Sequence, residues 1–250
     1  YIDQSTVPLE KELYLEELNF IDQVKLVLND LNVCSKKFLT NKVDRSVTGL
    51  ISQQQCVGPF QLPLSNFSIT NLSFKDNVGI ASSIGEQPLK GIKNIYSMID
   101  MTLGELLTNL IFVKVDSLES IKVLTNWMWS INIETNDFLL TCAAIYLTDQ
   151  LKKLNIGIDG GKDSLFMNYK SEWETVMSPN TLVLKSIAPC KNINKKVSPF
   201  FKKPNSIIIY IDFNKHIRLG GSIFYKVNNK IGNYDEQPHF ENIGGFKYVW

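Results

Sequence analysis

The chain alternates between two hydrophobic periods, and this alternation restricts the folds that it can adopt. Apolar and polar residues alternate from Phe67 to Ser73, as in a strand with one buried face, and Gly79 to Ile84 looks like its neighbour. From Asn94 to about Val113 apolar residues recur at helical spacing around a wide face. The same two patterns predict a short strand, a helix and a strand of branched residues at 121–124, 137–154 and 181–187. We therefore expect a body of strands and helices over 67–187.

The two ends of the chain differ from this body. Leucines and other apolar residues from Leu15 to Leu31 recur at near-helical spacing, which predicts a helix that stops before Cys34, and a second short helix is expected at 36–42. A lysine-rich connector that contains prolines, 191–204, precedes a run of branched residues at 206–212, which predicts a further strand. Such a polar connector is typical of a domain boundary, which we place near Lys203. The last residues, 219–250, contain one helix-like run and end on aromatic residues expected to be exposed; they are too few for a core of their own.

Composition excludes several classes of protein. At 250 residues, 44% of them hydrophobic, the chain has enough apolar content for one large domain or two small ones. Its net charge of +1 disfavours a nucleic-acid partner. Four widely spaced cysteines and two histidines do not form a zinc pattern. Because no apolar run reaches about 18 residues and no signal-peptide pattern is present, we expect no membrane partner and a reducing, cytoplasmic setting with free thiols.

The chain contains only two arginines, Arg45 and Arg218, among its 26 basic residues. Lysine serves a solvated surface as well as arginine does, but it cannot reproduce the bidentate contact of a guanidinium with a carboxylate or phosphate. The two arginines are therefore either chance survivors of a lysine-rich composition or residues retained for a function.

The stretch from Leu39 to Leu64 has little periodicity that packing would select, yet it contains Arg45, three consecutive glutamines and Gly58-Pro59. Two later blocks follow it, Gly104-Glu-Leu-Leu-Thr-Asn109 and Asp159-Gly-Gly-Lys-Asp-Ser164. In this order the three blocks resemble the start of the second half of the synthetase region in the phosphoribosylformylglycinamidine synthase family (FGAM synthase, formylglycinamide ribonucleotide amidotransferase). The resemblance runs from about Lys36 to about Leu219.

The resemblance implies an α+β / α/β fold of the aminoimidazole ribonucleotide synthetase (PurM)-like superfamily. In that fold an N-terminal-type domain with a mixed sheet and helices on one face is followed by a C-terminal-type α/β domain. Accordingly, we expect a helical connector from a preceding domain at 1–46, a PurM-like N-terminal-type domain at 47–203, and the truncated start of a PurM-like C-terminal-type domain at 204–250.

Glu105 and Asn109 stand four residues apart, which places a carboxylate and a carboxamide on one face of the predicted helix. Oxygen ligands of this kind suit Mg²⁺, although spacing alone favours a polar pair on the solvated face. The resemblance implies instead that both residues coordinate Mg²⁺ at a bound ATP or ADP. A further family ligand is an aspartate in a Pro-Leu-Ala-Asp segment, where this chain reads Pro63-Leu-Ser-Asn66. Ser65 is then expected at the nucleotide and Asn66 at the metal, with the neutral carboxamide weakening metal binding.

The Asp159 to Ser164 block is expected to be a tight turn after a strand. Its adjacent glycines would let the backbone approach a ligand, and its lysine could meet an anion. The resemblance implies contacts to the nucleotide or the substrate there, and Thr125-Asn-Trp-Met128 resembles another family element near the same pocket. The expected ligand-pocket residues are Asn126, Gly160, Gly161, Lys162, Asp163 and Ser164.

The resemblance implies part of an ATP-dependent ligase of de novo purine biosynthesis. The family converts formylglycinamide ribonucleotide, ATP and glutamine into the amidine, ADP, phosphate and glutamate. Cys56 is a candidate nucleophile, but no sequence motif pairs it with a histidine or an acidic residue. This favours a structural role for its thiol. The family's catalytic histidine and glutaminase cysteine lie in other domains. We thus expect no catalytic residue here, no turnover by this chain alone, and as partners the first synthetase half and the glutaminase domain of the same synthase.

An alternative from another class is a non-catalytic homologue that acts as an interaction or structural module, such as the viral tegument proteins that resemble this synthase. Asn66 in place of aspartate favours it, as does Asp100, where the family helix usually carries arginine. The intact Gln-Gln-Gln-Cys-Val-Gly-Pro block, 53–59, favours the enzyme.

Overall fold

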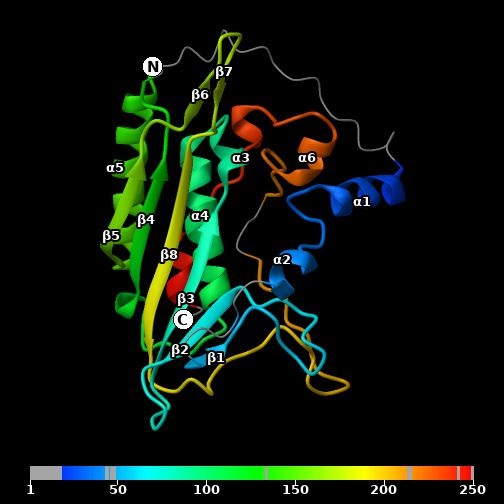
Figure 1. The fold of residues 1–250 in the computed structure, drawn as a ribbon, viewed down its shortest axis with the longest axis vertical. Coiled ribbons are helices and arrows are strands. Elements are labelled where there is room, and N and C mark those ends of the chain that lie inside the picture. Colours follow the sequence, from blue (N-terminus) through cyan, green and yellow to red (C-terminus); the bar gives the residue numbers. More distant parts are fainter. Residues whose placement is uncertain are drawn as a thin grey trace.

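Six strands form one mixed sheet that carries its long helices on one face (Figure 1). The structure is a computed structural model that describes residues 19–42, 45, 49–132, 135–212, 216–240 and 243–248. The strands of the sheet are β1 (Ile51–Gln53), β2 (Phe67–Asn71), β3 (Gly79–Glu86), β4 (Lys122–Met128), β5 (Gly157–Ser164) and β8 (Thr181–Cys190). Their order across the sheet is β1-β2-β3-β8-β4-β5. Only the β4–β5 pair is parallel, so the sheet is mixed.

The remaining elements surround this sheet. β6 (Asn168–Lys170) and β7 (Thr175–Met177) form a separate hairpin. The helices are α1 (Phe20–Asn29), α2 (Lys37–Lys42), α3 (Pro88–Gly91), α4 (Ile95–Leu110), α5 (Asn136–Leu154) and α6 (Ile223–Val227), with short 3₁₀ helices at Leu118–Ser120, Tyr234–Glu236 and Ile243–Tyr248. None of the described helices is both long and apolar enough to cross a membrane.

Helix α4 is the centre of the core. Asn94 caps its start by accepting hydrogen bonds from the backbone N–H groups of Tyr96 and Ser97. Eleven of its residues are buried, so the helix is covered on most sides, unlike a surface helix with a single apolar stripe. It packs against β3, β8 and α5. The helix expected at 94–113 is thereby confirmed.

Close contact between α4 and β3 depends on Gly85. A Cβ atom on Gly85 would lie 2.2 Å from the backbone oxygen of Thr102 and 2.8 Å from the backbone nitrogen of Leu106. The buried hydroxyl of Ser83 also donates to the backbone oxygen of Leu106 over 2.8 Å. The strand and the helix therefore touch backbone to backbone, which brings polar side chains of α4 within reach of β3.

None of the helices that the structure describes packs on the opposite face of the sheet (Figure 1). Along β3 and β8 the residues that face α4 are buried, whereas alternate residues are not: Ile84 is 52% exposed, and Val183 and Lys185 lie on the same side. We call this side, which includes Ile84, Leu124, Asn126, Val183 and Lys185, the open face. A sheet with one apolar face packed and another partly apolar face uncovered has a further surface to bury.

Two expected elements differ in the structure. The block at 159–164 is not a tight turn but most of β5, because β4 offers a parallel backbone partner along its whole length. The strand expected at 206–212 is wrong: these residues pair with no strand, and Ile207 is 90% exposed and Tyr210 85% exposed. Branched residues favour an extended backbone, but a strand also needs an adjacent edge, and no described edge lies beside this run.

The closing segment, residues 216–240 and 243–248, does not end entirely on exposed aromatics. Phe246 is fully buried and joins the core cluster, whereas Tyr248 is 89% exposed. The helix Ile243–Tyr248 packs on α5 and α4, so the segment shares the core of the main body. At the other end, α1 and α2 lie within the helices expected at 15–31 and 36–42, with 15–18 outside the described residues.

Candidate functional site

The expected metal ligands meet at the end of β3, where that strand loses a neighbour. Phe67, the first residue of β2, pairs with Ser83, so Ile84 to Glu86 extend past the start of β2. Their backbone groups on that side need other partners, because unpaired groups at a strand edge are unfavourable.

Helix α4 supplies these partners through the two residues of the expected metal site. Oε2 of Glu105 accepts hydrogen bonds from the backbone N–H of Glu86 and from Nε2 of Gln87, each over 2.9 Å. Nδ2 of Asn109 donates to the backbone oxygen of Ile84, also over 2.9 Å. Both side chains thus replace β2 as partners of β3, which gives them a structural role that the sequence did not reveal.

One oxygen of each side chain stays available. Oε1 of Glu105 and Oδ1 of Asn109 accept no hydrogen bond from any residue that the structure describes. Lys90 lies nearby: its Nζ donates to Oε1 of Gln87 over 2.6 Å. Burial lowers the pKa of Lys90, and the negative charge of Glu105 offsets part of that effect. The Lys90 ammonium is therefore a nearby cation that attracts the Glu105 carboxylate.

Ser65 and Asn66 lie at the same end of β3, just before β2 begins. The Ser65 hydroxyl donates to the backbone oxygen of Phe67 over 2.8 Å, and the Ser65 N–H donates to the backbone oxygen of Gln55 over 2.7 Å. Ser65 is half-buried and held in place, whereas Asn66 is exposed. The structure thus brings all four residues of the expected metal and nucleotide site to one end of one strand.

The expected ligand-pocket residues lie at the same level of the sheet, on β4 and β5, two and three strands away from β3. Across the sheet Glu86 pairs with Val183, Val183 with Asn126, and Asn126 with Lys162. Three strand spacings separate the ends of this row, or about 14 Å. The two groups of predicted residues therefore share one end of the sheet without forming one compact pocket.

The residues of β5 divide between its two sides. Lys162 shares the open face with Asn126, and its Nζ donates to Oγ of Ser164 over 2.7 Å. Gly161 turns toward the helices, where a Cβ atom would lie 2.4 Å from Thr125. Oδ1 of Asn126 is buried and has no hydrogen-bond partner within the described part of the chain. Of this set, Asn126 and Lys162 offer polar groups on a common surface, next to Gly160; Asp163 is exposed.

The side chains at the end of β3 suit a hard cation but would bind it weakly on their own. Oxygen donors from Glu105, Asn109 and Asn66 are of the kind that Mg²⁺ prefers, yet only Glu105 carries charge. Across residues 19–248, masked positions aside, no group of three or more His, Cys, Asp or Glu side chains is arranged to hold a metal ion. The donor set therefore fits Mg²⁺ when phosphate oxygens of a nucleotide complete it.

Cys56 has the contacts of a structural thiol. Its side chain is buried, and its sulfur lies 3.5 Å from Oδ1 of Asn41 and 3.8 Å from the backbone oxygen of Thr40. All four cysteines are free thiols.

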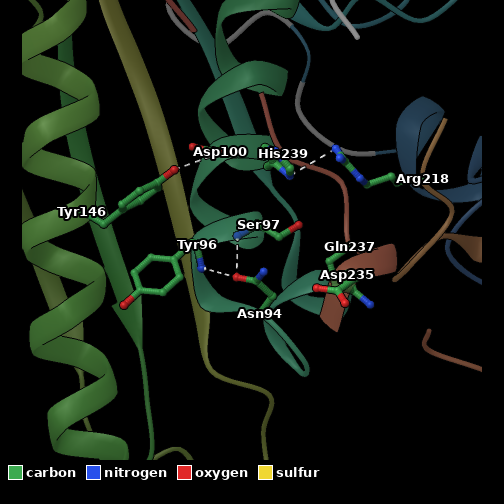
Figure 2. A pocket seen from close by; sticks show the side chains of 9 residues that line it. All are labelled: Asn94, Tyr96, Ser97, Asp100, Tyr146, Arg218, Asp235, Gln237 and His239. Carbon is green, nitrogen blue, oxygen red and sulfur yellow. Dashed lines mark hydrogen bonds between the residues drawn. The ribbon is translucent and has the colours of Figure 1, made fainter. Parts of the chain in front are cut away.

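A polar pocket of about 390 Å³, away from the end of β3, was not anticipated from the sequence. Figure 2 shows Tyr146 of α5 pointing toward Asp100 of α4, with Arg218 and His239 reaching in from the closing segment. Burial raises the pKa of Asp100 to about 6, against the lowering effect of its hydrogen bonds from Tyr146 and the Phe240 N–H. The low arginine content singles out Arg218, but no local sequence pattern predicts that Arg218 and Asp100 line the same pocket.

The mixed sheet and the helices on one of its faces define a PurM-like domain. The solved structure described as PurLQS from Thermotoga maritima has the same fold, with a TM-score of 0.50 at 14% identity over 78% of this chain and 27% of that one. Residues 35–189 match the FGAR-AT PurM_N-like domain family, and the chain belongs to it.

Curated relatives extend the similarity beyond that domain. The chain is 44% identical over 217 residues to phosphoribosylformylglycinamidine synthase of Drosophila melanogaster, covering 85% of the chain and 16% of the relative. It is 40% identical over 243 residues to the Dictyostelium discoideum synthase, covering 94% and 18%. It is 37% identical over 206 residues to the Homo sapiens synthase, covering 81% and 15%. The chain therefore spans less than a fifth of the length of these relatives.

Proposed function

We propose that this chain acts as part of a phosphoribosylformylglycinamidine synthase, the ATP-dependent ligase that converts formylglycinamide ribonucleotide, ATP and glutamine into the amidine, ADP, phosphate and glutamate. Within it, the end of β3 carries part of an Mg²⁺–nucleotide site. The observation that carries the proposal is the orientation of Glu105 and Asn109: each is fixed to β3 by one polar atom, and each keeps an oxygen available. Identity of 44% to a curated synthase supports it.

Each residue has a defined task in this proposal. Glu105 and Asn109 hold the metal through oxygens that the backbone of β3 has already oriented, so little side-chain freedom is lost on binding. Asn66 supplies a neutral third oxygen, and Ser65, anchored to Phe67 and Gln55, lies beside the nucleotide. Bound Mg²⁺ neutralises charge on the phosphate oxygens.

The open face supports a role inside a larger enzyme. Ile84, Leu124 and Val183 form a partly apolar surface on a sheet whose other side is packed. We propose that this face contributes one wall to an interface with the first synthetase half, and that the glutaminase domain belongs to the same assembly. The isolated chain should then form no amidine, with either glutamine or ammonia as nitrogen donor, and robust turnover would contradict the proposal.

Substitutions at Glu105 and Asn66 test the metal site. In Glu105→Gln the amide oxygen still accepts from Glu86, so the fold is retained while the charge is lost. We expect Mg·ADP affinity, measured by titration calorimetry, to fall about tenfold or more in this variant. Asn66→Asp adds a carboxylate and should raise the affinity by about tenfold. Asp76→Asn, far from these ligands in the loop after β2, is the control. Absence of Mg·ADP binding by both the unmodified chain and Asn66→Asp would refute the site.

The alternative is a non-catalytic homologue, and one observation favours it: Glu105 and Asn109 already serve the fold through their bonds to β3. In that case Glu105→Gln changes neither stability nor any nucleotide affinity. The same titration therefore separates the two functions.

A further inference from the structure

The pocket between α4, α5 and the closing segment contains opposite charges that are not paired with each other. Its walls carry a set of polar and aromatic side chains: Asn94, Tyr96, Ser97, Asp100, Tyr146, Arg218, Asp235, Gln237 and His239 (Figure 2). None of these is a ligand in the proposed metal and nucleotide site. The volume of about 390 Å³ is in the range of sites for small molecules.

Two buried acceptors in this wall lack donors. Asp100 and Gln237 are each 1% exposed. Oδ2 of Asp100 accepts from Tyr146 and from the Phe240 N–H, at 3.1 and 3.3 Å, but Oδ1 has no partner among the described residues. Nε2 of Gln237 donates to three backbone oxygens, and Oε1 is likewise without a donor in the described chain. Buried acceptors without donors are unfavourable, so a ligand that brings N–H groups would be stabilised here.

Arg218, by contrast, is a donor group that lacks an anionic acceptor in the described residues. One of its terminal nitrogens lies 3.3 Å from Nδ1 of His239. Because a guanidinium has donors only, the imidazole accepts at that nitrogen. Arg218 forms no ion pair with a carboxylate in the described residues, although Asp235 lines the same pocket. Its planar fork is therefore available for a carboxylate or a similar anion.

The pocket wall also carries aromatic side chains. The rings of Tyr96 and Tyr146 meet edge to face with their centroids 4.9 Å apart. A metal ion does not account for the pocket, since the described chain contains no group of three metal-binding side chains. A polyanion does not fit either, because Asp100 and Asp235 would repel it.

We propose that this pocket binds a small zwitterion of the amino-acid type. Its ammonium group donates to Asp100 and Gln237, its carboxylate accepts from Arg218, and its side chain packs on Tyr96 and Tyr146. Buried acceptors select the cationic end and the guanidinium selects the anionic end, so both charges of the ligand are required.

The binding test uses the full chain and the twenty L-amino acids, one at a time, in titration calorimetry. We expect at least one to bind with saturation, and its N-acetyl and its amide derivatives, which each lack one charge, to bind about tenfold more weakly. Failure of all twenty to bind with saturation overturns the proposal. Equal binding of the derivatives overturns it as well, because either charge would then be dispensable.

Two variants with matched controls test the residues. Asp100→Asn keeps an oxygen for Tyr146 and Phe240 but turns the free acceptor into a donor, and Arg218→Gln removes the guanidinium. Both should lower the affinity about tenfold or more. The controls are Arg45→Gln, at the only other arginine, which bonds to Gln61, and Asp116→Asn, at an exposed pair with Lys191. If the two pocket variants bind as well as the controls, the assignment is wrong.

Proton release distinguishes a ligand contact from a structural role of Asp100. The charged or titratable groups that face it are Lys153 and Tyr146 from α5 and Arg218, Asp235 and His239 from the closing segment. A bound ammonium lowers the pKa of Asp100, which is about 6, so binding near pH 6 should release protons that Asp100→Asn does not release. Calorimetry in two buffers of different ionisation enthalpy measures the number of protons released on binding. An equal release by Asp100→Asn would contradict a contact between the ammonium group and Asp100.

Discussion

At the scale of single residues, Asp100 is unusual because it is a buried carboxylate with a raised pKa. It is buried between α4, α5 and the closing segment, and only one of its oxygens is hydrogen-bonded to the described residues. Periodicity predicted a helix here but gave no reason for a buried carboxylate, because its partners lie 46 and 140 residues away in the sequence. Local pattern cannot supply such long-range contacts.

The raised pKa of Asp100 predicts a pH-dependent stability. The pKa of Asp100 is about 6 in the folded chain and 3.8 in the unfolded chain. The stabilisation of the folded state by the protonated carboxyl is therefore fully present below pH 3.8 and is lost as the pH rises through about 6. Relative to Asp100→Asn, the free energy of unfolding of the unmodified chain should fall by about 2 to 3 kcal/mol across this window. Urea denaturation of both proteins at several pH values measures it, and parallel pH profiles would refute it.

At the scale of elements, the sequence predicted the helices α4 and α5 and the strands β2, β3, β4 and β8 because each has a regular hydrophobic period. It failed at β5, whose glycines resemble a turn, and at 206–212, where branched residues find no partner strand. In both places pairing with another strand decided the outcome. The sequence revealed the motif that contains Glu105 and Asn109. It did not predict the hydrogen bonds of these residues to β3, because those bonds depend on how closely α4 and β3 pack.

That close packing predicts different effects for two glycines. In Gly85→Ala the new methyl group meets backbone atoms of Thr102 and Leu106, so α4 must move away and the protein should lose at least about 2 kcal/mol of stability. In Gly160→Ala the nearest atom is Cδ2 of Leu124 at 3.6 Å, an ordinary contact, and a small gain of about 0.5 kcal/mol is expected. Thermal or urea unfolding compares the two. Similar losses of stability in the two variants would show that α4 can move away from β3 at little cost.

At the scale of the whole molecule, the closing segment completes the main core. Phe246 is fully buried, and Phe240 packs so closely on Gly104 that a Cβ atom there would lie 2.1 Å from its ring. The same segment brings Arg218 and His239 to the unanticipated pocket. Composition showed that these residues could not form a core alone, but not where they would pack, because their few apolar residues fit many surfaces.

Phe246→Ala should therefore destabilise the whole chain. Removal of a fully buried ring leaves a cavity and should cost about 3 to 5 kcal/mol in the free energy of unfolding. Tyr248→Ala, at a residue that is 89% exposed two positions later, should change it by about 0.5 kcal/mol or less. If both variants unfold at the same urea concentration as the unmodified chain, the closing segment contributes nothing to the core.

The bonds of Glu105 and Asn109 to β3 have a consequence for descent. Selection for folding alone would keep side chains at both positions that can make these bonds, because β3 depends on them beyond the start of β2. A descendant that had ceased to bind metal would therefore keep Asn109 and tolerate glutamine in place of Glu105, while Asn66, whose exposed side chain makes no such bond to β3, would be free to change. Under the proposed function, the charge at positions 66 and 105 is thus a better indicator of nucleotide binding than the rest of the signature on α4.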